Sequence, residues 1–335
     1  MNKHLGKQTI RFDNPPVIIA TSSIVGPREG EGPLATYFDT IIEDELYGEN
    51  TWEKAESKLI EKALDKVIEK ANKTIDDVKY IVSGDLLNQL SASTFGIRNF
   101  KIPFLGVYGA CSTMAESLSI AAIIVEGGFA DYVIACTSSH FCCAEKQFRS
   151  PLELGGQRPL TSTWTVTGSG AIFLAESGEG PKITYVTTGK IVDFNIKDAM
   201  NMGAVMAPAA ADTIINHFID TERDENYYDL IITGDLGKVG KDLVLEILKQ
   251  YNYDISSKYM DCGIEIYEPD KQDTHSGGSG CGCGAVTLAG YIFSEIGKGK
   301  WKKVLFVATG AMLSQVSLQQ GESIPGIAHA VAIEN

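Results

Sequence analysis

The chain repeats part of its own sequence, and this duplication constrains its fold more than any other feature. VKYIVSGDLLN, which ends at Asn88, matches YDLIITGDLGK, which ends at Lys238, without a gap and at an offset of 150 residues. A second pair follows in the same order at an offset near 170, where the segments that start at Gly109 and Gly280 each lead into an apolar helical pattern and then into a β-branched run. Two matches in one order indicate that one structural unit occurs twice.

The repeat predicts two related halves, residues 1–178 and 179–335. They would join just after Gly178-Glu-Gly-Pro181, a stretch typical of a turn. At roughly 150 residues per domain, the 335 residues are enough for two domains or for one large duplicated unit. The first half would carry Cys111.

Short apolar runs alternate with helical patterns along both halves. The helical pattern is clearest from Glu53 to Ala71, where one face is apolar and the other is rich in Lys and Glu. The apolar runs are too short for helices and too apolar for a sheet face in water, so they suit strands that are covered on both sides. The runs predicted as strands are Val17–Ala20, Tyr80–Val82, Tyr132–Ala135, Ala171–Leu174, Leu230–Ile232 and Val304–Val307. The alternation predicts an α/β fold.

Charge and hydropathy exclude several kinds of function. The chain has 43 acidic and 29 basic residues, a net charge of −14 that repels phosphate backbones, so nucleic acid is not an expected partner. The longest apolar stretch, Ile120 to Val125, is far shorter than the ~20 residues that span a bilayer. The amino-terminal segment lacks the apolar core of a secretory signal. We therefore expect a soluble chain, and the odd number of cysteines, seven, predicts reduced thiols rather than a disulfide framework.

Cys111 lies where a predicted strand meets a predicted helix. Phe104-Leu-Gly-Val107 has strand character, and a helical pattern with almost no charge apart from Glu116 runs on to about Glu126. Backbone N–H groups and the helix dipole favour a thiolate at such a corner, so we expect a lowered pKa for this thiol. The alternative is an ordinary core cysteine, because free cysteines are among the most buried residues. The uncharged helix is predicted to lie in the middle of the fold.

Three of these segments resemble the thiolase and ketoacyl synthase superfamily. Gly-Ala-Cys111-Ser-Thr is similar to its nucleophile elbow, Thr167-Gly-Ser-Gly-Ala-Ile-Phe-Leu174 to its glycine-rich strand, and Val-Ala-Thr-Gly-Ala-Met-Leu-Ser314 to the loop of its last strand. The resemblance covers nearly the whole chain. It implies a thiolase-like fold in which the two α/β halves are layered α-β-α-β-α, and it implies no cofactor.

A narrower resemblance is carried by SGDLLNQL, GVYGACSTMAESL, QFRSPLELGGQRPLTSTWTVTGSG and HSGGSGCGCGAV. These segments are similar to the stage V sporulation protein AD family, the thiolase-fold subunits of a spore transport system for dipicolinic acid. The resemblance implies a protein of the developing spore, peripheral to the spore inner membrane. The implied partners are dipicolinic acid, with or without calcium, and the membrane-embedded stage V sporulation subunits; a homodimer is compatible with this interpretation.

The chain departs from the condensing enzymes of the superfamily in its second half. Those enzymes pair the elbow cysteine with a histidine after a strand of the second half and with a further histidine or asparagine before the next helix. Here the first position reads Gly234-Asp235, and His275 lies near the second. Because an ionised Asp235 cannot donate a hydrogen bond to an oxyanion, binding without catalysis is predicted. Asp235, like Asp85 at the equivalent place in the repeat, is expected to be a turn or cap residue.

The predicted ligand site combines residues from strand ends and loops. His140 follows a strand at its carboxyl end, where α/β sheets place ligands. Arg149 and Arg158 belong to a predicted loop of roughly twenty residues that also holds Lys146, and arginine forks suit paired carboxylates. The alternative is a solvated loop whose cations pair with Glu145 and Glu153. The full set of predicted ligand-binding residues is Cys111, His140, Arg149, Arg158, His275, Gly310 and Ala311.

No metal site is predicted. Cys281-x-Cys283 and Cys142-Cys143 lack the spacing of zinc ligands, and the run from Gly277 to Gly284 lacks the lysine of a phosphate-binding loop. The sequence thus favours non-catalytic binding of dipicolinic acid or its calcium chelate, for uptake into the developing spore, in a pocket derived from a thiolase active site. Two alternatives stay open: a condensing enzyme resembling ketoacyl synthase III, and a purely structural subunit of a spore membrane assembly.

Overall fold

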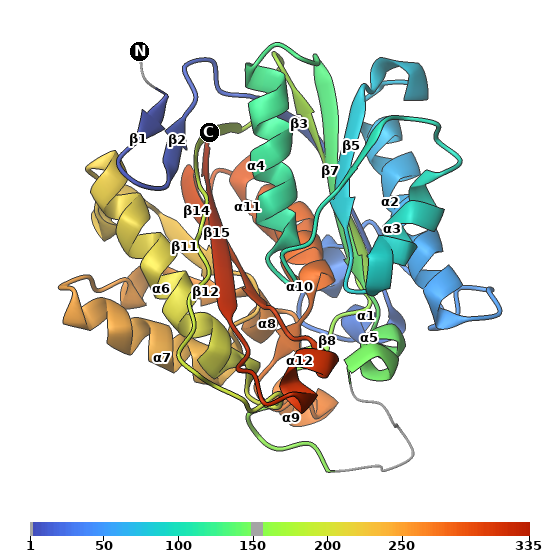
Figure 1. Ribbon diagram of the computed structural model, residues 1–335. Coiled ribbons are helices and arrows are strands. Elements are labelled where there is room, and N and C mark those ends of the chain that lie inside the picture. The colour runs from blue at the N-terminus through green and yellow to red at the C-terminus, as the bar shows by residue number, and fades with distance from the viewer. Residues whose placement is uncertain (1–2, 149–156) are drawn as a thin grey trace.

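The computed structural model describes residues 3–148 and 157–335. Figure 1 shows the first half of the chain, blue to green, beside the second half, yellow to red, with helices on the outer sides and between the strands. Ten strands form one hydrogen-bonded path in the order β12-β11-β14-β15-β10-β3-β9-β7-β5-β6. The predicted α/β class is confirmed.

The first half contributes five strands to this path. They are β3 (Val17–Val25), β5 (Tyr80–Gly84), β6 (Phe104–Gly106), β7 (Tyr132–Ser139) and β9 (Gly168–Ala175). Strands β6, β5 and β7 are parallel neighbours, while β9 is antiparallel to both β7 and β3. Counted along the chain, the order in space is therefore 1-5-4-2-3, with the fifth strand reversed against its neighbours.

The second half repeats this arrangement. Its strands are β10 (Lys182–Thr187), β11 (Leu230–Thr233), β12 (Tyr259–Asp261), β14 (Lys303–Ala311) and β15 (Gly326–Glu334). Strands β12, β11 and β14 are parallel, and β15 is antiparallel to β14 and β10, so the spatial order is again 1-5-4-2-3. The two first strands meet antiparallel at a single pair, Lys182 and Val17. The duplicated sequence is thus a duplicated sheet.

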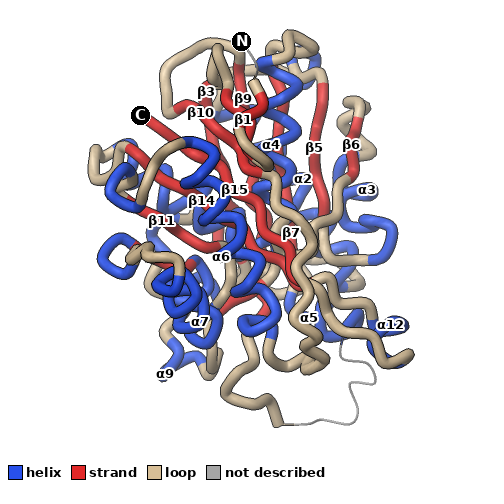
Figure 2. The backbone as a smooth tube through the Cα atoms, turned by 60° about the vertical axis from the view of Figure 1, so that its left-hand side comes forward, coloured by secondary structure: helices blue, strands red, loops and turns tan. Residues whose placement is uncertain are grey.

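The outer layers consist of helices packed on each half. Helices α2 (Trp52–Lys70) and α3 (Ser91–Ile97) cover the first half, and α6 (Met202–Thr221) and α7 (Gly237–Gln250) cover the second. Figure 2 shows α6 lying across β14 and β15. The α2 helix starts one residue before the predicted Glu53 because the Thr51 side chain caps the N–H of Lys54. Its stripe of leucine, isoleucine and valine is fully buried, and each such side chain contributes about 1.5–3 kcal/mol.

The middle layer is the helix α4 (Thr113–Glu126) together with α10 (Cys281–Val286). The α10 helix continues through a π-helical stretch, Thr287–Ile292, into α11 (Phe293–Gly297). Strands of both halves contact α4, which is therefore the buried central helix that its lack of charge predicts. A side chain at Gly170 would come within 2.6 Å of the Ala285 carbonyl oxygen, so this glycine lets β9 and α10 approach closely. The predicted α-β-α-β-α layering is confirmed.

Short elements complete the chain around these layers. They are β1 (His4–Leu5), β2 (Thr9–Arg11), α1 (Pro27–Gly30), β4 (Thr40–Ile41), α5 (Phe141–Phe148), β8 (Trp164–Thr165), α8 (Cys262–Glu265), α9 (Pro269–Gln272), β13 (Gly278–Ser279) and α12 (Gln315–Gln319). The α5 helix corrects one expectation, because it carries Lys146, which was predicted in a loop. The ammonium group of Lys146 pairs with Glu53 at 2.5 Å.

Across residues 3–148 and 157–335, no helix is both long and apolar enough to cross a membrane.

Candidate functional site at the Cys111 elbow

The predicted strand-to-helix corner is present at Cys111. This residue follows β6 and precedes α4, and the Ser112 hydroxyl donates to the Gly109 carbonyl at 2.6 Å while the Thr113 hydroxyl donates to the Ala110 carbonyl at 2.6 Å. Ala110 has a φ of 51°, in the left-handed region that an alanine occupies at a cost of roughly 1 kcal/mol or more. The surrounding hydrogen bonds hold this strained corner and fix the position of the thiol.

The carboxyl of Asp235 lies near enough to Cys111 for each group to shift the pKa of the other. Asp235 follows β11. Its Oδ1 accepts from the Thr309 hydroxyl at 2.7 Å, and its Oδ2 accepts from the backbone N–H of Gly280 at 3.0 Å. Strand ends from both halves and the amino end of α10 therefore meet at the elbow. Sequence reasoning missed Asp235 as a site residue and assigned it to a turn or cap.

Comparison of the two repeats explains why Asp235 is available to the thiol. In the first half, Asp85 accepts from the N–H groups of Leu87 and Ser93, so it is the turn residue that was predicted. In the second half, the N–H of Gly237, the equivalent of Leu87, donates to Asp261 instead, at 3.0 Å. Because Asp261 accepts the hydrogen bonds from the N–H groups of this turn, the carboxyl of Asp235 is left to interact with Cys111.

Burial sets the protonation of this pair. Removal from water is the largest effect on Cys111, and with the nearby Asp235 carboxyl it raises the pKa of the thiol well above its usual value. Cys111 keeps a partly exposed surface. The expectation of a lowered pKa at the helix end is therefore wrong, because desolvation and a neighbouring carboxyl outweigh the helix dipole. Burial also raises the pKa of Asp235, to about 7, against hydrogen bonds from Thr309 and Cys111 that lower it.

We expect Cys111 to react slowly with iodoacetamide near neutral pH, more than tenfold more slowly than glutathione, because the thiolate is the reactive form. Asp235→Asn should raise the rate about tenfold at pH 8, since one pKa unit changes the thiolate fraction tenfold. Peptide mapping after timed alkylation measures both rates. Asp85→Asn, at the equivalent place in the repeat, is the matched control and should leave the rate unchanged; rapid alkylation of Cys111 in the unaltered chain would contradict the assignment.

Two further groups lie against the elbow. Tyr108 is 40% exposed, and burial of its hydroxyl together with the nearby Cys111 raises its pKa to about 12. Gly310 packs on the elbow backbone, because an added Cβ would come within 2.3 Å of the Gly109 carbonyl oxygen. The side chain of Ala311 belongs instead to the apolar cluster packed around α6. Of the two predicted wall residues, the structure thus brings Gly310 to Cys111.

His140 is buried and held by its neighbours. Its Nδ1 accepts from the backbone N–H of Cys142 at 3.2 Å, and its Nε2 lies 2.8 Å from the Glu45 carbonyl oxygen, to which it donates. Burial lowers the pKa of this imidazole, so the neutral form that these bonds require is favoured. Both ring nitrogens are therefore engaged in joining the start of α5 to the segment around Glu45.

His275 and Arg158 meet at another loop junction. His275 Nδ1 lies 2.9 Å from the Pro159 carbonyl oxygen and its Nε2 lies 3.0 Å from Asp273. Arg158 donates to the Asp273 carbonyl oxygen at 2.7 Å, and its guanidinium lies 4.5 Å from the centre of the Trp164 ring. These contacts tie the segment before β8 to the segment before β13. Arg149, the remaining predicted ligand residue, lies outside the described residues.

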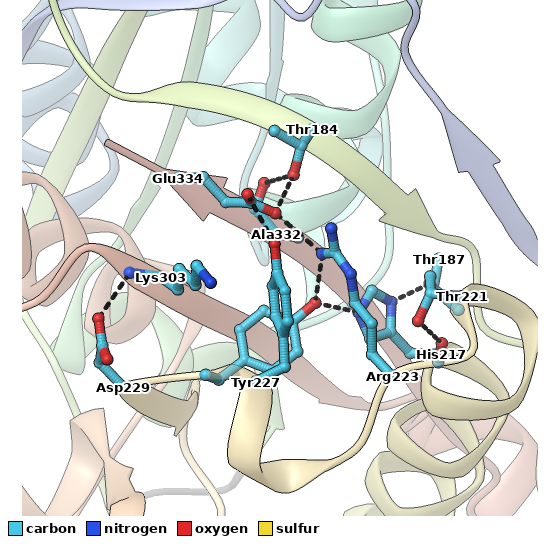
Figure 3. A network of polar contacts seen from close by, with 11 residues as sticks. Thr184, Thr187, His217, Thr221, Arg223, Tyr227, Asp229, Lys303, Ala332 and Glu334 are labelled. Carbon is cyan, nitrogen blue, oxygen red and sulfur yellow. Dashed lines mark hydrogen bonds and ion pairs between the residues drawn. The ribbon is translucent and has the colours of Figure 1, made fainter.

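A second polar network lies at the carboxyl-terminal strand and is structural (Figure 3). Arg223 donates to Glu334 at 2.8 Å and stacks 3.8 Å from the centre of the Tyr227 ring. His217 lies between Thr187 and Tyr228, and its burial lowers the pKa of the imidazole to about 3. These groups join α6 to β10 and β15.

Within the described parts of the chain, no three His, Cys, Asp or Glu side chains gather as metal ligands.

Comparisons with known proteins agree on the relatives and on the fold. The sequence pattern of the family described as Stage V sporulation protein AD matches residues 6–334. The chain is similar to Stage V sporulation protein AD of Bacillus subtilis (strain 168), with 46% identity over 332 residues, covering 99% of this chain and 98% of that protein.

Two solved structures share the fold at low sequence identity. One is 3-oxoacyl-[acyl-carrier-protein] synthase III from Aquifex aeolicus VF5, with a TM-score of 0.57 and 12% identity, covering 96% of this chain and 100% of that one. The other is OleA from Xanthomonas campestris with cerulenin bound, with a TM-score of 0.60 and 15% identity, covering 97% of this chain and 98% of that one. At these identities the likeness shows the thiolase-like fold alone.

Proposed function

The chain belongs to the stage V sporulation protein AD family, and from this membership we propose that it binds dipicolinic acid, free or as its calcium chelate, without chemical turnover. The bound compound would be taken up into the developing spore, at the spore inner membrane, together with membrane-embedded subunits. Family membership over nearly the full length supports the ligand, the partners and the location. The elbow supports the absence of turnover.

One observation carries the non-catalytic part of the proposal: the carboxyl that faces Cys111 is Asp235. A condensing reaction needs a thiolate nucleophile and hydrogen-bond donors for the developing oxyanion. Burial and Asp235 keep the thiol protonated. Above about pH 7, where Asp235 is mostly ionised, its carboxylate repels an oxyanion instead of donating to it. Loss of a single oxyanion donor lowers kcat about 10²–10³-fold in enzymes that depend on it. The arrangement therefore suits the holding of a ligand better than acyl transfer.

Calorimetric titration of the full chain with dipicolinate, with and without calcium, tests the binding. We expect saturable heat in at least one of the two conditions. Isophthalate lacks the ring nitrogen and benzoate also lacks the second carboxylate, so both should compete poorly at a site matched to dipicolinate or its chelate. No heat from dipicolinate in either condition would reject the proposal and favour a purely structural subunit.

The second candidate, a condensing enzyme, is favoured by the cysteine at the elbow and by the shared fold. Incubation of the chain with acetyl and malonyl thioesters distinguishes it. We expect no ketoester above the uncatalysed background. Steady ketoester formation that disappears in Cys111→Ala would establish catalysis and overturn the non-catalytic proposal.

A further inference from the structure

The short helix α1 places an arginine on an aromatic pair. The Arg28 guanidinium lies 3.8 Å from the centre of the Trp164 ring, and Phe141 stacks on the same ring with centroids 3.7 Å apart and planes within 1° of parallel. Arg158 brings a second guanidinium to 4.5 Å from the same ring centre. Helices α1 and α5 and strand β8, which supply three of these residues, lie together at the lower right of Figure 1.

The backbone on both sides of Arg28 is fixed. The Arg28 carbonyl accepts from the Gln272 side chain at 2.7 Å. The next residue, Glu29, is fully buried, accepts from the backbone N–H of Thr167 at 3.0 Å and contacts the Tyr267 hydroxyl. Trp164 is held in turn by the pairing of β8 with β13. The guanidinium and the indole are therefore preorganised, so ligand binding costs less side-chain conformational entropy.

One donor of the Arg28 guanidinium, its Nε, lacks a partner among the described residues. Over residues 3–148 and 157–335, the Arg28 side chain forms no ion pair, and its Nε is buried without an acceptor. A buried donor that is left without a partner costs about 1–3 kcal/mol, so such a group calls for an explanation. The cation–π contact with Trp164 stabilises the positive charge of the guanidinium, but the ring does not replace a hydrogen-bond acceptor for its N–H groups. A planar acceptor in reach of the guanidinium fork would satisfy them, and a carboxylate has that geometry.

We propose that Arg28 and Arg158, held against the Trp164 indole, form a binding subsite for the carboxylate of a small aromatic acid, with Arg28 as its principal contact. This inference rests on the proposed function, because dipicolinate is such an acid. The subsite is connected to the elbow through β13. Trp164 and Thr165 pair with Gly278 and Ser279 of this strand, and the N–H of the next residue, Gly280, donates to Asp235.

Tryptophan fluorescence and calorimetry test the subsite. The full chain carrying Trp52→Phe and Trp301→Phe leaves Trp164 as the reporter, and dipicolinate and picolinate are the probes. We expect a saturable change of Trp164 emission with both acids. Arg28→Gln should raise the dissociation constant of dipicolinate at least tenfold, and Arg28→Lys, which keeps the charge but not the fork, should recover part of the affinity. Arg98→Gln is the matched control, because Arg98 lies over Phe95 elsewhere in the fold; it should leave binding unchanged.

The outcomes separate the subsite from the proposed function. If calorimetry of the unaltered chain shows dipicolinate binding that Arg28→Gln does not weaken, the subsite is overturned and the function stands. If dipicolinate gives no heat, the function fails; an Arg28-dependent emission change with picolinate then supports the subsite, and its absence overturns it. Inorganic phosphate added in place of the acids should give no change, and a phosphate response equal to that of picolinate would overturn the assignment to an aromatic carboxylate. Thermal unfolding of each variant confirms that the fold is retained.

Discussion

Dipicolinate affinity should fall by up to about tenfold for each pH unit above about 7, and Asp235→Asn should remove most of this fall. Burial raises the pKa of Asp235 to about 7, so this carboxyl is mostly neutral below that pH and mostly ionised above it. A dianion bound beside Cys111 raises this pKa further, and binding above pH 7 therefore requires uptake of a proton. Well below pH 7, the proton is already present and affinity should be independent of pH.

Calorimetry from pH 6 to pH 9 in buffers of different ionisation enthalpy measures both the affinity and the proton uptake. Asp85→Asn is the matched control, because Asp85 occupies the equivalent place in the repeat but accepts from Leu87 and Ser93. It should retain the full pH dependence. The calcium chelate has no net charge, so its binding should depend on pH much less. Equal slopes in Asp235→Asn and the unaltered chain would show that no carboxylate of the ligand lies near Asp235.

The sequence was sufficient for the fold where local pattern and tertiary environment agree. The duplication and the apolar runs predicted strands β3, β5, β7, β9, β11 and β14, the surface helix α2 and the buried helix α4. Strand β15 was not predicted, since Ala328, Ala330 and Ala332 give its sequence weak β propensity. The strand forms because β14 pairs with it along its whole length and both of its faces are buried. That environment is not visible in a local window.

The site was harder to predict because its key residue depends on a partner far along the chain. Gly234-Asp235 and Gly84-Asp85 look alike in sequence, and their different roles follow from Asp261. In the paired strands, Asp261 stands beside Thr233 where the first half has Gly106 beside Ser83. The presence of Asp261 in the second repeat, where the first repeat has Gly106, was the sequence signal that the two turns differ. The places of His140 and His275 at strand and loop ends predict ligand contacts, yet the structure uses their ring nitrogens to join segments.

Glu56→Gln should stabilise the chain by about 2–4 kcal/mol at pH 8 and by less than about 1 kcal/mol at pH 5. Glu56 lies on α2 and is 1% exposed; its Oε1 accepts from the Ser138 hydroxyl at 2.9 Å, whereas its Oε2 is buried without a partner in the described residues. Burial, reinforced by the nearby Asp85, raises the pKa of Glu56 from 4.5 to about 8. An acid whose pKa is raised by folding favours the unfolded chain as the pH increases, because only the unfolded chain ionises between about pH 4.5 and pH 8. Glutamine keeps the size and removes this ionisation.

Urea unfolding of the two proteins at pH 5 and pH 8 gives the difference in the free energy of unfolding at each pH. Glu53→Gln, one turn earlier on the same helix, is the matched control with the opposite sign. Its hydrogen bond from Lys146 lowers the pKa of Glu53, so this carboxylate stabilises the fold above its unfolded pKa, and its loss should cost less than about 1 kcal/mol at pH 8 because the pair is partly exposed. A Glu56→Gln effect that is the same at both pH values would show that packing, and not the suppressed ionisation of this carboxyl, sets the energy of the site between α2 and β7.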